Sequence, residues 1–120
     1  MSGQATPRCV LVAEDESLLA MLVEDVLSDA GYRVLKAARL PAALALAGSE
    51  HLDAAILDIN LDGTAVFPVA EALRALGVPF LFASGYGQAG IPDEFHGVPV
   101  LQKPYLPATL HRAVADLLGE

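Results

Sequence analysis

Short apolar runs alternate along the chain with segments whose apolar residues recur at helical spacing. Apolar, β-branched runs of four to seven residues are typical of strands, and runs that are apolar throughout are typical of strands covered on both faces. The expected strands are residues 9–13, 32–37, 52–58, 78–84 and 98–102. The expected helices are residues 17–30, 41–47, 67–76 and 107–118.

This alternation predicts a doubly wound α/β fold, with a five-stranded parallel sheet and helices on both of its faces. One stretch breaks the alternation. Residues 85–97 read GYGQAGIPDEFHG, with four glycines and a proline, where a helix between the last two strands is expected. We expect a mobile loop there, with at most one helical turn over residues 93–96.

Length and composition limit the class of protein. A chain of 120 residues with 54% hydrophobic content suffices for one domain, residues 1–120, and no second domain fits. The net charge of -8 and scattered basic residues argue against direct nucleic-acid binding. The lone Cys9 excludes an internal disulfide and is typical of a buried residue in a reducing compartment. Residues 1–8 are polar, and no signal peptide or membrane-spanning stretch is evident, so we expect a cytoplasmic protein.

Reactive side chains stand at the ends of four expected strands. They are Glu14 and Asp15 after the first strand, Asp58 at the end of the third, Ser84 at the end of the fourth, and Lys103 with Pro104 after the fifth. The carboxyl ends of parallel strands share one edge of the sheet, which is where open α/β folds bind ligands. Three carboxylates, a hydroxyl and an ammonium are therefore predicted to meet in one small volume.

Each of these residues also has an ordinary structural explanation. Glu14 and Asp15 can cap the following helix, Ser84 before a glycine is typical of a turn, and Lys103 can be a solvated surface lysine. Three neighbouring carboxylates, however, raise one another's pKa and cost stability. A divalent cation removes that cost, and Mg²⁺ binds carboxylates together with phosphate oxygens. A hydroxyl and an ammonium beside them are suited to a transferred phosphoryl group.

In this order, over five strand-helix units, these residues resemble the receiver domain of two-component response regulators, the CheY-like family. The resemblance covers residues 8–118 and implies the strand order 2-1-3-4-5. The run PFLFASGYG at residues 79–87, with Lys103-Pro104-Tyr105, further resembles a subgroup named for its Phe-Ala-Thr/Ser-Gly-Tyr strand end. Many members of that subgroup are stand-alone receivers. The fourth helix is expected to be short or disordered, which is a departure from the usual receiver pattern.

The resemblance implies a role for each site residue. Asp58 would be the phosphoacceptor for a bacterial histidine kinase or histidine phosphotransferase, and Ser84 and Lys103 would bind the phosphoryl oxygens. Phosphoryl transfer depends largely on positioning and charge neutralisation, and the carboxylate would act as the nucleophile. The protein would not be an enzyme, but a phosphoacceptor with at most self-phosphorylation from small donors and slow self-dephosphorylation.

The resemblance also implies a metal site for Mg²⁺ or Mn²⁺. Asp15 and Asp58 would bind the ion directly, together with the main-chain carbonyl of Asn60, and Glu14 would act through water. No metal site is expected at the three histidines, which have no ligand spacing and are expected at the surface: His51, His96 and His111.

Receivers commonly carry an aromatic switch residue three positions before the lysine, where this chain has Val100. The switch candidates are therefore Ser84, Tyr86 and Tyr105. The two tyrosines are equally explained as half-buried loop aromatics. We expect phosphorylation to order residues 85–97.

Two alternatives remain open. A haloacid-dehalogenase-like phosphatase also uses a strand-end aspartate and Mg²⁺, but it needs a second aspartate two residues later, where this chain has Asn60. A receiver-fold interaction module that is not phosphorylated is the other. The sequence does not choose between a phosphate relay, a phosphate sink and phosphorylation-switched binding to a target. It predicts no output domain in this chain, no membrane contact, and a monomer or weak dimer. Asp62-Gly63 is expected to be a turn.

Overall fold

Five parallel strands form the central sheet of the protein. The computed structural model describes residues 6–120, so the first five residues of the polar segment 1–8 lie outside the described part of the chain. The strands are β1 (Cys9–Ala13), β2 (Arg33–Ala37), β3 (Ala54–Asp58), β6 (Phe80–Ser84) and β7 (Val100–Gln102). Their order across the sheet is β2-β1-β3-β6-β7. The predicted order 2-1-3-4-5 and the doubly wound α/β fold are thereby confirmed.

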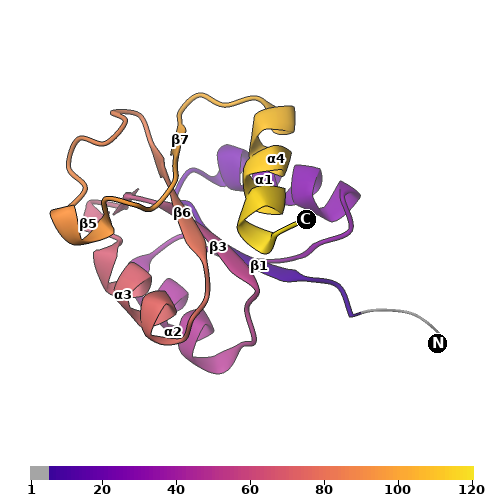
Figure 1. The fold of residues 1–120 in the computed structure, drawn as a ribbon, viewed down its shortest axis with the longest axis horizontal. Helices are drawn as coiled ribbons and strands as arrows, with labels where there is room; N and C mark the ends of the chain where they lie inside the picture. The colour runs from indigo at the N-terminus through magenta and orange to yellow at the C-terminus, as the bar shows by residue number, and fades with distance from the viewer. Residues whose placement is uncertain (1–5) are drawn as a thin grey trace.

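Two helices cover each face of the sheet (Figure 1). α1 (Ser17–Asp29) and α4 (Pro107–Leu118) lie on one face, and α2 (Leu40–Ser49) and α3 (Phe67–Ala75) lie on the other. The strand β3 shows why the inner strands are apolar along most of their length: Ile56 belongs to the core beneath α1 and α4, and its neighbour Leu57 belongs to the core beneath α2 and α3. Within residues 6–120, no helix combines the length and the apolar character needed to cross a bilayer.

The observed strands β2, β3, β6 and β7 begin one or two residues later than the apolar runs predict. Proline explains two of these differences, because Pro79 and Pro99 directly precede β6 and β7 and lack the N–H that a ladder needs. Leu52, before β3, still contributes to the core from its loop, with 5% of its surface exposed. An apolar run therefore marks buried residues as well as the strand itself.

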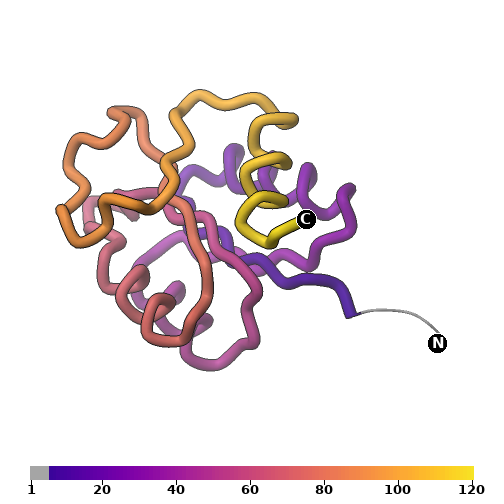
Figure 2. The backbone as a smooth tube through the Cα atoms, viewed as in Figure 1, coloured from indigo at the N-terminus to yellow at the C-terminus, as the bar shows by residue number. Residues whose placement is uncertain are grey.

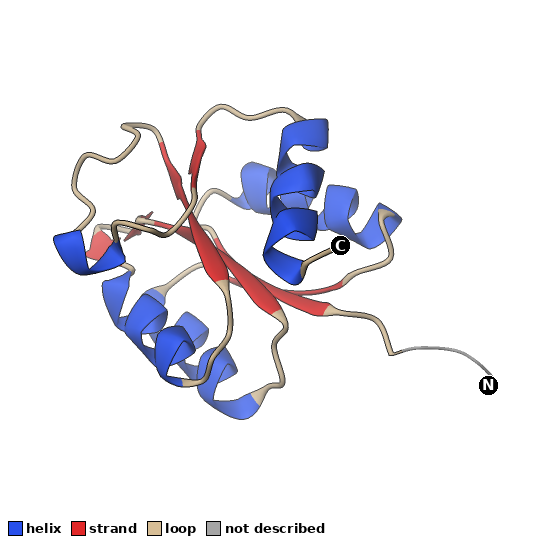
Figure 3. Cartoon of the chain, in the orientation of Figure 1, coloured by secondary structure: helices blue, strands red, loops and turns tan. Residues whose placement is uncertain are grey.

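The connection from β6 to β7 has no full helix, as predicted (Figures 2 and 3). It carries a single helical turn, η1 (Asp93–Phe95). Phe95 is fully buried against three other phenylalanines, and the Arg74 guanidinium lies 4.5 Å from the centre of its ring. Ile91 is buried as well. The second half of this loop is thus anchored to the core, and the mobility that we expect from its glycines stays a prediction for residues 85–90.

A small hairpin after β3 is not predicted by the sequence pattern. It consists of β4 (Asn60–Leu61) and β5 (Thr64–Ala65), which pair in antiparallel fashion around the predicted Asp62-Gly63 turn. Asp62 has φ 52° and Gly63 has φ 85°. A two-residue hairpin turn of type I′ requires positive φ at both central residues, and Asp-Gly is a favoured pair for it. The hairpin begins two residues after Asp58, and so it lies close to the carboxyl edge of the sheet.

Candidate functional site

The side chain of Lys103 joins two of the predicted carboxylates. Its Nζ lies 2.8 Å from Asp58 Oδ2 and 3.0 Å from Glu14 Oε1. The strand register brings these residues to one edge of the sheet. Ala13 is paired with Leu57, Asp58 with Ala83, and Ser84 with Gln102, at the carboxyl ends of neighbouring strands. Only 22% of the Lys103 side chain is exposed. Lys103 is therefore a member of the site and not a solvated surface lysine.

Glu14 is the most deeply buried carboxylate of the site, with 4% of its side chain exposed. Burial raises its pKa to about 7, and the charge of Asp58 acts in the same direction. The Glu16 amide, 3.1 Å from Glu14 Oε2, and the Lys103 ammonium both act to lower the pKa but do not cancel the effect of burial. Glu14 therefore changes charge near neutral pH. Its contact with the Glu16 amide shows that it also supports the start of α1.

The pKa of Lys103 is raised, although burial alone would lower it. Burial acts to lower it, but the hydrogen bonds to Asp58 and Glu14 outweigh burial and raise the pKa to about 12. The ammonium is consequently charged at every physiological pH. It supplies a permanent positive charge directly beside the Asp58 carboxylate.

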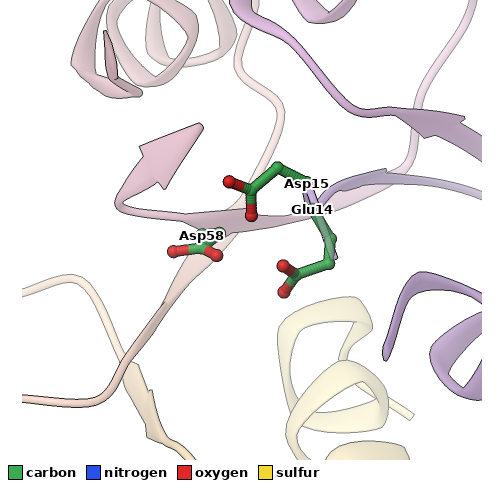
Figure 4. Close-up of side chains that lie close together, drawn as sticks. All are labelled: Glu14, Asp15 and Asp58. Carbon is green, nitrogen blue, oxygen red and sulfur yellow. The ribbon is translucent and has the colours of Figure 1, made fainter. Parts of the chain in front are cut away.

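Asp15 completes a group of three carboxylates. One oxygen from each of Glu14, Asp15 and Asp58 lies within 4.8 Å of the others, and the three side chains converge on one space (Figure 4). When all three are ionised, three carboxylates and one ammonium leave two negative charges in this space. Hard oxygen ligands carrying two uncompensated charges suit Mg²⁺ better than they suit softer metals. The residues present therefore fit the predicted cation.

Asn60 lies beside Asp58 through its main chain. Its amide donates to Asp58 Oδ1 at 3.2 Å, while its side-chain Oδ1 accepts from the Gly63 amide at 2.8 Å. The side chain thus stabilises the hairpin turn. The predicted binding of a cation by the Asn60 carbonyl stays a prediction.

Ser84 lies at the end of β6 with 1% of its surface exposed. Its Oγ accepts a hydrogen bond from the Tyr86 amide at 3.0 Å, and its carbonyl accepts one from the Lys103 amide at 2.8 Å. The residue therefore also performs the turn role that its position before Gly85 suggests. Both contacts tie Ser84 to other candidates for the site and the switch.

The two switch tyrosines differ in their surroundings. Tyr86 is 82% exposed, so its interpretation as a half-buried loop aromatic is wrong; the loop carries the ring away from the core directly after Gly85. Tyr105 is half-buried, and burial, followed by the charge of Glu14, raises its pKa to about 12. It follows Lys103 and Pro104, whose peptide bond is cis.

Asp62 is a contributor to the site that the sequence analysis misses. Its amide donates to Asp15 Oδ2 at 2.8 Å, and its carboxylate accepts from Arg39 Nη1 at 2.7 Å. The Asp-Gly pair is a signal for a two-residue hairpin and could have revealed the hairpin. The contact with Asp15 could not have been inferred from that signal, because it depends on the path of the loop.

Residues 10–115 match the family described as the response regulator receiver domain. The chain belongs to this family. Receiver domains of two-component systems are in general phosphoacceptors and not classical enzymes, and they interact with histidine kinases or phosphotransferases. The predicted family is thus confirmed, and a haloacid-dehalogenase-like phosphatase is no longer needed to explain the strand-end residues.

Three relatives illustrate the similarity. The uncharacterized transcriptional regulatory protein YrkP of Bacillus subtilis (strain 168) is 32% identical over 115 residues, which are 90% of this chain and 48% of that protein. The receiver chain thus spans about half the length of this curated relative. The solution structure of SdrG from Sphingomonas melonis Fr1 is 38% identical, with a TM-score of 0.82 over 96% of this chain and 99% of SdrG.

The third relative shares the fold at lower identity. It is the receiver domain of the sensor histidine kinase PA1611 from Pseudomonas aeruginosa PAO1, which has a magnesium ion coordinated in its active site cleft. It is 22% identical, with a TM-score of 0.78 over 96% of this chain and all of that one.

Proposed function

We propose that this receiver domain accepts a phosphoryl group on Asp58 from the phosphohistidine of a sensor histidine kinase or a histidine phosphotransferase. The observation that carries the proposal is the position of Asp58, whose carboxylate lies 2.8 Å from the Lys103 ammonium and within the group of three carboxylates. An aspartate that only ended a strand would need neither the ammonium nor the other carboxylates beside it.

The transfer forms one bond and breaks one bond. A carboxylate oxygen of Asp58 attacks phosphorus as the phosphorus–nitrogen bond of the donor breaks, and the imidazole nitrogen keeps the electron pair. The product is an acyl phosphate. The Asn60 amide and Lys103 hold the two Asp58 oxygens, and this fixed orientation reduces the entropy lost on reaching the reactive alignment.

Two side chains would bind the phosphoryl oxygens. Lys103 carries its charge throughout the physiological range, because its pKa is about 12. The Ser84 hydroxyl accepts from the Tyr86 amide and still has its own proton to donate. Donors already in place stabilise charge without reorganisation during the reaction.

Asp15, Asp58 and the Asn60 carbonyl would hold Mg²⁺, with Glu14 acting through water. When bound, the ion neutralises negative charge on the phosphoryl oxygens and on the carboxylates. Support comes from the oxygen-only ligands of this site and from the magnesium ion in the PA1611 receiver. Mn²⁺, which also accepts oxygen ligands, is the alternative ion.

The residues around the site also support an assignment of the chain to a subgroup of the receiver family. We place it in the Phe-Ala-Thr/Ser-Gly-Tyr subgroup, supported by the sequence FASGY at residues 82–86 and by Lys103-Pro104-Tyr105. The Ser84 hydroxyl that would donate to the phosphoryl group also accepts the Tyr86 amide, so residues 85–90 would respond first. We propose a cytoplasmic receiver, consistent with the buried thiol of Cys9.

Trapping the acyl phosphate tests this function. The protein is incubated with phosphoramidate and Mg²⁺ and then reduced with borohydride, which converts a phosphorylated aspartate to homoserine. Peptide mapping should find the change at residue 58, and not at the exposed control residue Asp93. Labelling of another carboxylate, or equal labelling of several, would contradict the proposal. The protein could instead be folded and bind Mg²⁺ but stay unlabelled by every phosphodonor, including histidine phosphotransferases. That result would favour the unphosphorylated interaction module.

A further inference from the structure

Two short hydrogen bonds connect Arg39 to Asp15 through the hairpin turn. Arg39 Nη1 lies 2.7 Å from Asp62 Oδ2, and the Asp62 amide lies 2.8 Å from Asp15 Oδ2. Arg39 directly precedes α2, Asp62 lies between β4 and β5, and Asp15 follows β1. Three segments that are distant in the sequence therefore meet at the exposed side of the carboxylate group.

Asp15 depends on this connection more than the other two carboxylates do. Glu14 and Asp58 are buried, and each accepts a hydrogen bond from Lys103 and from a main-chain amide. Asp15 is exposed, and its hydrogen bond comes from the Asp62 amide. That bond engages Oδ2 and leaves the carboxylate a second oxygen for a cation. An exposed side chain without such a contact loses more rotamer entropy when it binds an ion.

The side chain of Asp62 has a role beyond the conformation of the turn. Asp62 is left-handed, with φ 52°, and asparagine or glycine would satisfy this backbone as well as aspartate does. Its carboxylate adds a negative charge close to an acidic site, which is unfavourable unless that charge is compensated. Arg39 provides the compensation and fixes the hairpin tip at the same time.

We infer that Arg39 and Asp62 are positioning residues for the cation: their ion pair holds the Asp62 amide against Asp15 and thereby strengthens Mg²⁺ binding. This inference rests on the proposed role of Asp15 as a ligand. Arg39 acts through Asp62 and does not touch the cation itself.

Loss of Arg39 should change the Mg²⁺ affinity in opposite directions, depending on whether Arg39 acts through its charge alone or by positioning Asp62. Removal of a positive charge near an acidic site should strengthen binding of a divalent cation, whereas loss of positioning should weaken it. Lys36 offers a matched control, because it lines a 250 Å³ hollow together with Glu14 and Asp15. Its Nζ pairs with Glu24 at 2.8 Å. Lys36→Ala removes the same charge without touching the hairpin.

The test is a Mg²⁺ titration followed by amide chemical shifts, at about 150 mM salt to screen distant charges. Arg39→Ala should weaken Mg²⁺ binding about threefold to fivefold, a small effect because the ion pair is exposed and the Asp62 amide remains. Asp62→Asn should weaken it to a similar extent. The double variant should be no weaker than the stronger single effect, because both changes break one contact. Lys36→Ala should bind Mg²⁺ as tightly as the wild type or more tightly.

A second readout is independent of the ion. Hydrogen exchange of the Asp62 amide should be faster in Arg39→Ala and unchanged in Lys36→Ala. The inference is overturned if Arg39→Ala binds Mg²⁺ as tightly as Lys36→Ala does, or if its Asp62 amide exchanges at the wild-type rate. A wild-type protein that binds no Mg²⁺ would instead remove the proposed cation site, and this inference with it.

Discussion

The two sides of the candidate site hold their carboxylates by different means. On the buried side, Glu14 and Asp58 share the Lys103 ammonium at 3.0 and 2.8 Å. On the exposed side, Asp15 accepts the Asp62 amide at 2.8 Å, and Arg39 holds that residue in place. The first arrangement rests on charges that are largely shielded from water, and the second rests on main-chain geometry supported by a solvated ion pair.

This difference determines how strongly each side should respond to substitution. In this shielded site burial raises the pKa of Glu14 to about 7. The hydrogen bonds and charges of Asp58 and Glu14 outweigh burial at Lys103 and raise its pKa to about 12. An exposed ion pair contributes about 1 kcal/mol or less. We therefore expect large effects on the buried side and small ones on the exposed side.

The largest effect is expected from Lys103→Met. The change removes the cation beside Asp58 and should slow phosphorylation by phosphoramidate about 100-fold, the typical cost of losing one donor to a developing charge. The measurement is the rate of phosphoryl adduct formation at saturating Mg²⁺, scaled to the folded fraction. Lys36→Met, which removes an exposed lysine, should react at the wild-type rate. If the two variants are phosphorylated at equal rates, the shielded position of Lys103 does not make it more important for the reaction than an exposed lysine.

An intermediate effect is expected from Glu14→Gln on the pH dependence of stability. The pKa of Glu14 is about 7 in the folded protein and 4.5 for an unperturbed group, so its contribution is fully present below pH 4.5 and is lost as the pH rises through 7. Without Mg²⁺, the variant should therefore gain about 1 to 2 kcal/mol relative to wild type between pH 4.5 and pH 8, allowing for solvent screening.

Urea unfolding at these two pH values, in the presence of chelator, measures the gain. Glu24→Gln serves as a control, because this glutamate pairs with Lys36 outside the carboxylate group. A difference between wild type and Glu14→Gln that is the same at both pH values would mean that burial does not raise the pKa of Glu14.

The smallest effect is expected on the exposed side. Arg39→Ala should change the free energy of unfolding by less than about 1 kcal/mol in chelator, because 73% of the Arg39 side chain is exposed and such pairs are screened. The same urea experiment measures it. A loss comparable to that of a buried pair, about 3 kcal/mol or more, would place the hairpin contact among the elements that stabilise the fold and would erase the contrast between the two sides.

The three carboxylates and Lys103 could be predicted from the sequence, and the hairpin contact on the exposed side could not. Parallel topology brings strand ends to one edge, so Asp58 and Lys103 are placed by counting strands. The contact between Asp15 and Asp62 depends on a hairpin whose strands have two residues each, too short to show an alternating pattern. The burial of Phe95 could not be predicted from the sequence either, because the aromatic residues that surround it come from α3 and β6.

The most direct test of the central claim is the intact mass of the protein after incubation with phosphoramidate. Wild type and Asp58→Asn are compared, each with Mg²⁺ and with chelator, and circular dichroism confirms that both are folded. We predict one phosphoryl adduct on the wild type with Mg²⁺ and none in the other three samples. An adduct on Asp58→Asn of the same yield, or a wild-type adduct that is unaffected by chelator, would contradict a cation-dependent phosphoacceptor at Asp58.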